Sequence, residues 1–445
     1  MTSRRSILKL IWPLALGMAN SALMQFVDRA YLAHYSLEAL EAVLPAGLLM
    51  WVFAGFFQSL IGYANVLVGQ YHGANEPAKC LAAYRTATGV ALAAGVLSVP
   101  LVFVGYAIFD FTASSPRLLA DERSYFTIVM LGAVAAYGQM AAASYFTGRG
   151  RTRIVFWANL VGNALNVILD PILIFGWWGA PRLAIAGAAI ATVVSQLVQW
   201  LILSVVAWRE ADCGRESSSV TGAVRRDILG RLLRFGVPSA LYEMLNMISF
   251  TVFVFITEGV GALELAVSNA CFSVNYILFA PMMGFSLGAQ TLVAQAIGRK
   301  DPDGAAADAR RTVILGALFA AAISVAALVF AHPILDLFAA RAGESTAAFH
   351  DLGIRLLAIM GVWLLFDAVD IIIAGALKGA GDTKFVMMLS LVSSFAVWLP
   401  LVGIVKAFHN TMPMLWATMV VLVFVCFGAS FVRWRRGNWR KIQVT

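Results

Sequence analysis

Residues 86–109 read TATGVALAAGVLSVPLVFVGYAIF and contain no charged side chain. A helix of roughly 20 such residues rises far enough to cross the roughly 30 Å hydrocarbon core of a bilayer. Comparable uncharged runs occur at 42–75, 124–148, 183–208, 265–298, 312–335, 385–405 and 407–432. Four more segments qualify when isolated internal charges are allowed: 10–33, 154–177, 235–257 and 352–377. The sequence therefore predicts an all-α membrane protein with twelve transmembrane helices.

The composition supports a membrane class and argues against an enzyme. Hydrophobic residues make up 61% of the chain and charged residues 13%, about half the charge of a soluble protein. The four cysteines and five histidines show no metal-ligand spacing, and no phosphate-binding loop is present. An integral membrane enzyme would need paired acids beside a polar loop, or a nucleophile with a histidine. We therefore predict no enzyme activity, no metal site and no cofactor.

The net charge of +8 reflects membrane topology. If both termini are cytoplasmic, only seven of the 32 Lys and Arg residues fall near the opposite face: Arg29, Arg117, Arg123, Arg182, Arg341, Arg355 and Lys406. Basic residues concentrate on the cytoplasmic side of membrane proteins. The sequence thus predicts a multi-pass monomer in the inner (plasma) membrane, with both termini cytoplasmic. The basic tail 433–441 contacts membrane lipid in this interpretation, and no nucleic-acid partner is expected.

The chain contains two similar halves. A polar linker at 209–227 separates residues 1–208 (spans 1–6) from residues 228–445 (spans 7–12 and the tail). Segment 67–77 matches segment 292–302, and segment 147–153 matches segment 378–384. Chance similarity of short glycine-rich turns is the alternative to an internal duplication. An even number of spans per repeat gives both halves the same orientation and a pseudo-two-fold axis along the membrane normal.

One span carries a polar stripe within an apolar helix. The stripe consists of residues at i, i+4, i+7 and i+11, which share one helix face: Asn159, Asn163, Asn166 and Asp170. Ser21, Gln25 and Asp28 form a second stripe on the first span. Polar groups are costly in lipid, so both stripes should face protein or water. Two simpler interpretations stay open: Asp28 neutralises Arg29, and Asp170 makes a structural hydrogen bond.

The distance of each acid along its helix from the nearest cytoplasmic basic residue estimates its depth in the membrane, and acids of similar depth can share a site. Asp28 lies about 28 Å from Lys9, and Asp170 lies about 25 Å from Arg153, which is consistent with one shared site. Three further acids fall near the midplane of the second half: Glu243, Asp367 and Asp370. Two close carboxylates do not both ionise easily, so one of the pair Asp367 and Asp370 is expected to carry a proton. A hydrogen bond within the half is the simpler alternative for each acid.

These motifs together resemble the multidrug and toxic compound extrusion (MATE) family. The first half contributes Pro13 fifteen residues before Asp28, and Asn166-Val-Ile-Leu-Asp170-Pro171 in the fifth span. The second half contributes Asp367-Ala-Val and the segment 376–383 in the tenth span. The resemblance covers nearly the whole chain. It implies two six-helix lobes and the export of organic cations in exchange for protons or sodium.

The family's ion sites transfer to particular residues. The resemblance implies that Asp28, Asn166 and Asp170 form the coupling site, as in the DinF-like branch. It implies that Asp367 is the second-lobe acid of the NorM-like branch. The glutamate of that second site is replaced by Asn246, with Glu243 one turn earlier. The Asp-Arg pair at 28–29 also departs from the usual Asp-Thr.

The predicted function is a secondary antiporter that exports cationic or amphipathic small molecules by alternating access. A proton on the Asp28 and Asp170 site would exclude the drug. Pro13 and Pro171 interrupt helical hydrogen bonding and are expected to act as hinges. Gln25, Asn159, Asn163 and Asn246 would support the polar sites. A flippase for a lipid-linked or other anionic substrate is the alternative, although it would require basic residues inside the cavity.

Overall fold

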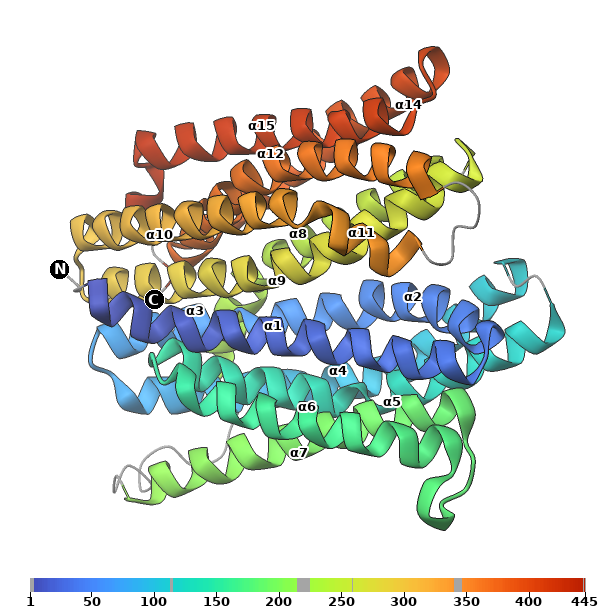
Figure 1. Cartoon of the computed structure of the whole chain (residues 1–445). Helices are drawn as coiled ribbons and strands as arrows, with labels where there is room; N and C mark the ends of the chain where they lie inside the picture. Colours follow the sequence, from blue (N-terminus) through green and yellow to red (C-terminus); the bar gives the residue numbers. More distant parts are fainter. Residues whose placement is uncertain are drawn as a thin grey trace. The chain divides into compact units, whose positions relative to one another are not determined.

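A computed structural model describes residues 4–112, 115–213, 225–257, 259–339, 346–442 and 444, and within these ranges it contains no β-strand. The helices of the first half are α1 (Arg4–Tyr35), α2 (Leu37–Gly62), α3 (Ala64–Gly73), α4 (Pro77–Thr112), α5 (Pro116–Gly148), α6 (Thr152–Phe175), the short 3₁₀ helix η1 (Trp177–Gly179) and α7 (Ala184–Cys213) (Figure 1).

The helices of the second half are α8 (Arg226–Thr257), α9 (Ala262–Gly298), α10 (Pro302–Val329), α11 (Ala331–Ala339), α12 (Thr346–Gly379), α13 (Thr383–Leu391), η4 (Val392–Trp398), α14 (Leu399–Phe408), α15 (Met412–Arg436) and η5 (Asn438–Lys441). The segment η4 is a π-helix that joins α13 to α14 without a break. The three together form the eleventh span.

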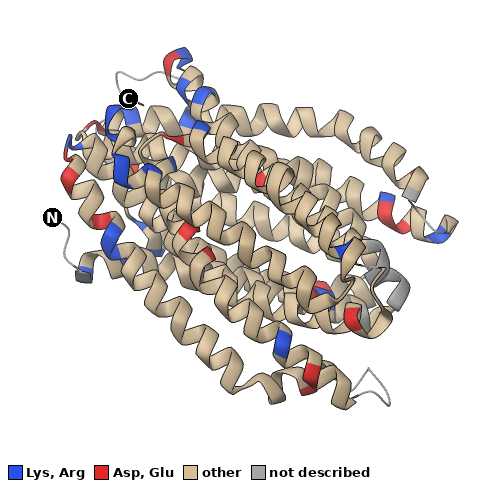
Figure 2. Cartoon of the chain, turned by 90° about the horizontal axis from the view of Figure 1, so that it is seen from above, with Lys and Arg blue, Asp and Glu red and all other residues tan. Residues whose placement is uncertain are grey.

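The described residues contain 12 helices that are long and apolar enough to cross a membrane. The predicted all-α fold class with twelve spans is therefore confirmed. Figure 2 shows long uncharged stretches along the helices, with most Lys and Arg near the helix ends. A few acidic residues interrupt those stretches.

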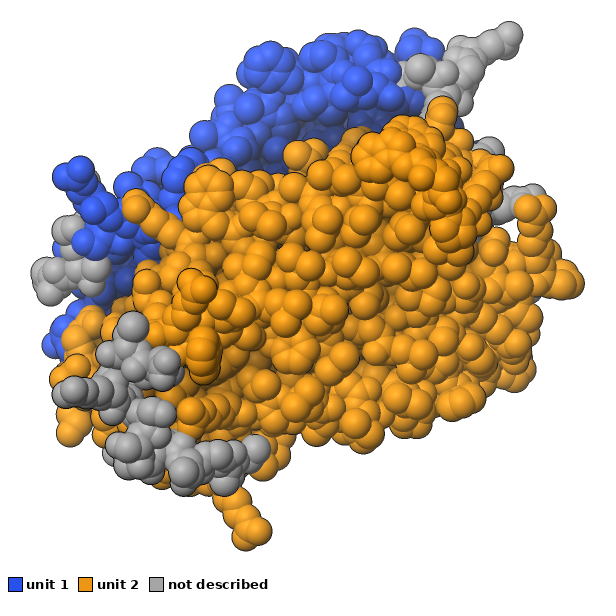
Figure 3. Space-filling model, turned by 90° about the horizontal axis from the view of Figure 1, so that it is seen from below, with its two compact units in different colours: residues 1–15, 245–293, 301–443 blue, residues 16–244, 294–300, 444–445 orange. Residues whose placement is uncertain are grey.

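The described chain packs as two compact units (Figure 3). Unit 1 comprises residues 1–15, 245–293 and 301–443, and unit 2 comprises residues 16–244, 294–300 and 444–445. Helices α1, α8 and α9 therefore each contribute residues to both units. The predicted division into 1–208, 209–227 and 228–445 describes the sequence repeat and stays a prediction. Residues 214–224 of the predicted linker lie outside the described residues.

The matched turns of the two halves adopt the same backbone conformation. Gly150 and Gly381 both have positive φ, at 76° and 92°. Asn75 and Lys300, which lie at equivalent positions of the other matched segment, both have φ of 59°. The residue after each of those glycines donates its backbone N–H to the carbonyl five residues earlier, at 2.9 Å in both halves. The sequence repeat is thus reproduced in local geometry.

Two glycines of the repeat sit where helix backbones touch. A β-carbon on Gly73, at the end of α3, would collide with the backbone oxygen of Gln295 in α9. A β-carbon on Gly298 would collide in the same way with the backbone oxygen of Gln70. All four residues belong to unit 2. The two ends of the repeat motif therefore pack on each other reciprocally, and only glycine fits at either contact.

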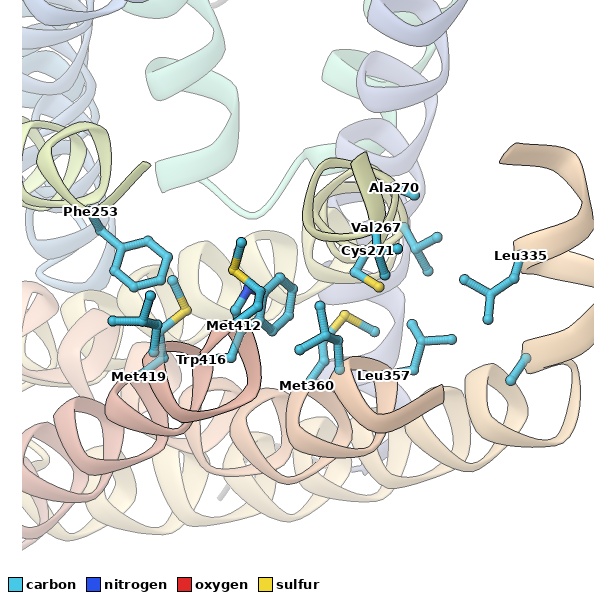
Figure 4. Packing of buried hydrophobic residues seen from close by; sticks show 14 of the residues in the cluster. Phe253, Val267, Ala270, Cys271, Leu335, Leu357, Met360, Met412, Trp416 and Met419 are labelled. Carbon is cyan, nitrogen blue, oxygen red and sulfur yellow. The ribbon is translucent and has the colours of Figure 1, made fainter. Parts of the chain in front are cut away.

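The core of unit 1 is rich in aromatic and sulfur-containing side chains (Figure 4). Phe253 stacks on Trp398 with ring centroids 5.2 Å apart, and Phe272 stacks on Trp416 at 4.5 Å. The indole nitrogen of Trp416 donates to the hydroxyl of Ser268 at 3.0 Å, so its polar atom is satisfied while buried. These contacts join α8, α9, η4 and α15 into one core.

An ion pair follows the repeated turn in each half, with opposite polarity. Asp382 is 4% exposed and accepts two hydrogen bonds from Arg433, from Nε at 2.7 Å and from Nη2 at 3.2 Å. At the matching position of the first half, Arg151 pairs with Glu210, which also accepts from Arg149 at 2.9 Å. In both halves the pair ties the turn to the last helix of the repeat.

Replacing Asp382 by arginine is expected to destabilise the protein by about 3–5 kcal/mol, because the substitution leaves like charges in a largely buried position. The double exchange of Asp382→Arg with Arg433→Glu reproduces the charge order of the first half and should restore most of the loss. Thermal unfolding of the purified protein in detergent measures both effects. A double variant as unstable as the single variant would contradict this account.

Candidate functional site

Helix α6 buries the predicted polar stripe. Asn166 and Asp170 are both 0% exposed, and Asn163 is 5% exposed. The helix continues through Pro171 and ends at Phe175. The following residue, Gly176, has a φ of 78°, the left-handed conformation that glycine favours. Since the stripe faces protein, it is shielded from any surrounding lipid.

Asn166 links α6 to α1 and α7. With its amide oriented to satisfy both neighbours, Nδ2 donates to Oδ1 of Asp28 at 2.8 Å. Its oxygen then accepts from the backbone N–H of Thr192 at 3.3 Å. The amide therefore places the carboxyl group of Asp28 beside α6.

Asp170 lies against Asp28, and the two carboxyl groups interact directly. Both oxygens of Asp170 are buried, and among the described residues no N–H or hydroxyl donates to them. Two ionised carboxylates are acceptors only, so they share a hydrogen bond only when one carries a proton. Arg29 and the phenol of Tyr125 on α5 add to the electrostatic surroundings of Asp28. The pair is thus a place where one proton can be held.

The two predicted stripes meet further along the helices. Nδ2 of Asn163 donates to the hydroxyl of Ser21 on α1 at 3.3 Å, and its oxygen accepts from Gln199 on α7 at 3.2 Å. Asn159 accepts from Gln139 on α5 at 3.1 Å. The asparagines therefore bridge three neighbouring helices rather than facing lipid.

The partners that α5 and α7 supply were not predicted from the sequence. Thr192 and Gln199 lie with Ser195 at i, i+3 and i+7 of α7, a spacing that puts them on one face. That polar stripe was present in the sequence as a signal. Tyr125 offered none, because a tyrosine near the end of a span is common at membrane interfaces.

The remaining first-half predictions lie on α1 and α6. Gln25 is partly buried on α1. Pro13 lies within the continuous helix α1, as Pro171 lies within α6. Pro13 belongs to unit 1, whereas Asp28 belongs to unit 2. The hinge roles of both prolines stay predictions.

The second-half acids divide between the two units, and their role in an ion site stays a prediction. Asp367 and Asp370 belong to unit 1, whereas Glu243 belongs to unit 2. Asp367 interacts with Trp363, and Asp370 interacts with Ser430. The oxygen of Asn246 accepts from the hydroxyl of Ser390 at 2.8 Å. Within the described ranges, no group of three or more His, Cys, Asp or Glu side chains is arranged to hold a metal ion.

Known proteins resemble this chain along its whole length. It is 24% identical over 434 residues to a probable multidrug resistance protein NorM of Bradyrhizobium diazoefficiens, covering 96% of this chain and 92% of the relative. A probable NorM protein of Thermotoga maritima is 23% identical over 443 residues, covering 99% and 94%. The DinF-like branch suggested by the first-half motif stays a prediction.

Solved structures share the fold. A eukaryotic MATE transporter superposes with a TM-score of 0.87 at 17% identity, covering 98% of this chain and 96% of its own. A MOP superfamily transporter from Pyrococcus furiosus superposes with a TM-score of 0.84 at 19% identity, covering 99% and 97%. The MatE family model matches residues 13–172 and 238–404, most of both halves. The chain therefore belongs to the MatE family of multi-pass membrane transporters.

Proposed function

We propose that this transporter exports organic cations or drugs across the inner membrane in exchange for protons. Relatives covering almost the whole chain carry the name multidrug resistance protein, which supports the substrate class. The coupling site in this proposal consists of Asp28, Asn166 and Asp170. Sodium is the alternative coupling ion for the same site.

The observation that carries the proposal is the pairing of Asp170 with Asp28. Ionising a single buried carboxyl group costs free energy because the charge loses its hydration. Ionising two neighbouring carboxyl groups costs still more because their charges repel each other. The repulsion between the two carboxylates falls when the pair takes up one proton or when a cation lies beside it. Since either guest satisfies the same negative charge, proton and drug exclude each other.

This exclusion gives a transport cycle. A site open to the outside takes a proton, loses its attraction for the organic cation and releases it. A site open to the cytoplasm loses the proton and binds the next cation. Bending of α1 at Pro13 would accompany the change. The outward-open and inward-open states differ in their affinity for the proton and for the organic cation. This difference couples the movements of the two ions.

An anionic cargo is not favoured. A flippase would need cationic side chains facing the substrate, and Arg29 and Arg355 are the basic residues of the spans that could supply them. Both side chains are exposed, and Arg355 forms an ion pair with Asp351 at 2.9 Å. The buried charged groups beside α6 are acidic instead.

Reconstituted transport tests the proposal. The purified protein in liposomes should move a fluorescent organic cation when a proton gradient is imposed. Transport that follows only a sodium gradient would replace the proton by sodium as the coupling ion. No cation transport under either gradient, with translocation of a fluorescent lipid analogue, would instead support the flippase.

Asn166→Ala is expected to lower proton-driven export roughly tenfold, which corresponds to ~1.4 kcal/mol of lost hydrogen bonding around Asp28. The alanine keeps the helix but leaves the carboxyl group of Asp28 without its amide donor. Initial rates in the same liposomes measure the effect, with elution volume and melting temperature as controls for folding. An unchanged rate would mean that Asn166 does not organise the site.

A further inference from the structure

Two histidines of unit 1 come together where α11 packs against α12. Nδ1 of His332 on α11 lies 3.2 Å from Nδ1 of His350 on α12. The ring centroids are 5.4 Å apart, so the two rings meet through these nitrogen atoms rather than stacking face to face. The spacing of ligands along the chain does not reveal this pair, because its members are 18 residues apart and only the packing of the two helices joins them.

Apolar packing holds the two rings in place. Helix α11 buries Ala331 and Leu335, which are 3% and 0% exposed. Leu335 fits against Gly353 of α12, where a β-carbon would collide with the leucine side chain. Residues three apart on a helix are neighbours on its surface, so His332 lies beside this contact. The side chain of His350 is only 15% exposed. Both rings are therefore carried by packed helices.

A carboxylate lies beside the other nitrogen of His350. Oδ1 of Asp336, one turn after His332 on α11, is 3.1 Å from Nε2 of His350. The two atoms are not aligned for a hydrogen bond, and the buried Nε2 atom has no hydrogen-bond partner among the described residues. The negative charge of Asp336 still favours the tautomer with its proton on Nε2, which leaves the lone pair of Nδ1 on the side of His332. Metal-binding histidines commonly have a carboxylate in this position.

The separation of the two Nδ1 atoms suits a tetrahedral transition-metal ion. Zn²⁺ binds imidazole nitrogen at about 2.0–2.1 Å, so two such ligands of a tetrahedral ion lie about 3.3 Å apart. The observed separation is 3.2 Å. Neutral imidazole is a good ligand for zinc, copper and nickel, whereas Mg²⁺ and Ca²⁺ prefer oxygen ligands. Without a metal ion, the same two atoms share one proton in an N–H···N hydrogen bond.

We propose that His332 and His350 form a transition-metal site that takes Zn²⁺, with Nδ1 of each ring as a ligand and water in the remaining positions. When the ion enters, the proton of the N–H···N bond moves to Nε2 of its own ring. Asp336 lies at the far nitrogen of His350, so it is a positioning residue and not a ligand. Two side-chain ligands are consistent with the lack of a three-residue cluster among the described residues.

A bound ion would tie α11 to α12 at the point where the ninth span ends and the tenth begins. The two helices are otherwise joined there by apolar contacts such as that of Leu335 with Gly353. The site is built from residues of unit 1, whereas Asp28 and Asp170 belong to unit 2. The inference therefore does not depend on the proposed transport function.

Zinc binding to the full-length protein in detergent, with no polyhistidine tag, tests the site. Titration calorimetry with zinc chloride should show one saturable site per chain. His332→Ala and His350→Ala should each weaken that site roughly a hundredfold or more, and Asp336→Asn should weaken it about tenfold. The control His409→Ala removes an exposed histidine of the same unit and should bind zinc like the wild type.

A second measurement counts the ligands. Electron paramagnetic resonance with Cu²⁺ in place of zinc should show hyperfine coupling to two imidazole rings in the wild type and to one in either alanine variant. His332→Cys keeps a side chain that binds zinc, so it should retain the calorimetric site that His332→Ala loses. Zinc should also raise the melting temperature of the wild type but not that of the double variant His332→Ala with His350→Ala.

Three results would overturn the inference. The first is a wild-type protein without saturable zinc binding. The second is equal zinc affinity of the wild type and the double variant, because the ion would then lie elsewhere. The third is coupling of Cu²⁺ to a single imidazole in the wild type. If an alanine variant does not fold, as its melting curve without metal would show, His332→Cys and Asp336→Asn supply the comparison instead.

Discussion

Cation export driven by a pH gradient should fall to the rate of protein-free vesicles when Asp170 is replaced by asparagine. Asparagine has nearly the same shape, but it cannot exchange a proton. It also gives the Asp28 carboxylate an amide donor in place of a competing charge. The Asp28 carboxylate then has a permanent hydrogen-bond donor beside it. The attraction of the site for a cation therefore no longer depends on pH.

Uptake of a fluorescent cation into everted vesicles with an acidic interior measures this loss, because the cytoplasmic face of such vesicles points outward. Glu76→Gln is the matched control, since it removes a carboxylate from an exposed pair with Lys79 in the same unit, and such pairs contribute little. Asp170→Glu, which keeps an ionisable group, should retain part of the coupling. Undiminished pH dependence in Asp170→Asn would refute the assignment of the proton to this residue.

The second large effect concerns the backbone contact between α3 and α9. Gly73→Ala should destabilise the protein by about 3 kcal/mol or more, because a β-carbon would press on a backbone oxygen that no side-chain rotation can move away. Gly298→Ala should behave alike, since its contact with Gln70 is reciprocal. Melting temperature and the yield of monodisperse protein measure both variants.

Gly230→Ala is the control for this prediction. Gly230 lies on α8 in the same unit, and a β-carbon there would meet no atom within 4 Å. Alanine should be neutral there or stabilising by up to ~1 kcal/mol, because it favours the helix. If Gly73→Ala has the same melting temperature as Gly230→Ala and the wild type, the close approach of the two helices is not required for stability.

The number and position of the spans could be predicted because charge is excluded from lipid. The spans at 86–109 and 183–208 could be predicted from their lack of charged residues alone. The break at Tyr63 between α2 and α3 had no such signal, and neither had the π-helical turn at η4. Both are adjustments of helical hydrogen bonding within apolar sequence, where composition does not change.

The candidate site could be predicted in part for a related reason. Asn163, Asn166 and Asp170 were visible because polar side chains in an apolar helix reveal which face is buried. The faces of α4 and α5 could not be assigned in this way, since lipid is as apolar as the protein interior. Contacts that join distant segments, such as Asn166 with Thr192, require the packing itself.

The sharing of α9 between the two units has a consequence for synthesis. Residues 294–300 complete unit 2, although they follow the rest of that unit by about fifty residues of chain assigned to unit 1. The first half therefore leaves the ribosome and enters the bilayer before its last packing element exists. Until translation passes Lys300, Gly73 lacks its native contact with the backbone of Gln295, and an interrupted nascent chain would present that surface to quality-control proteases.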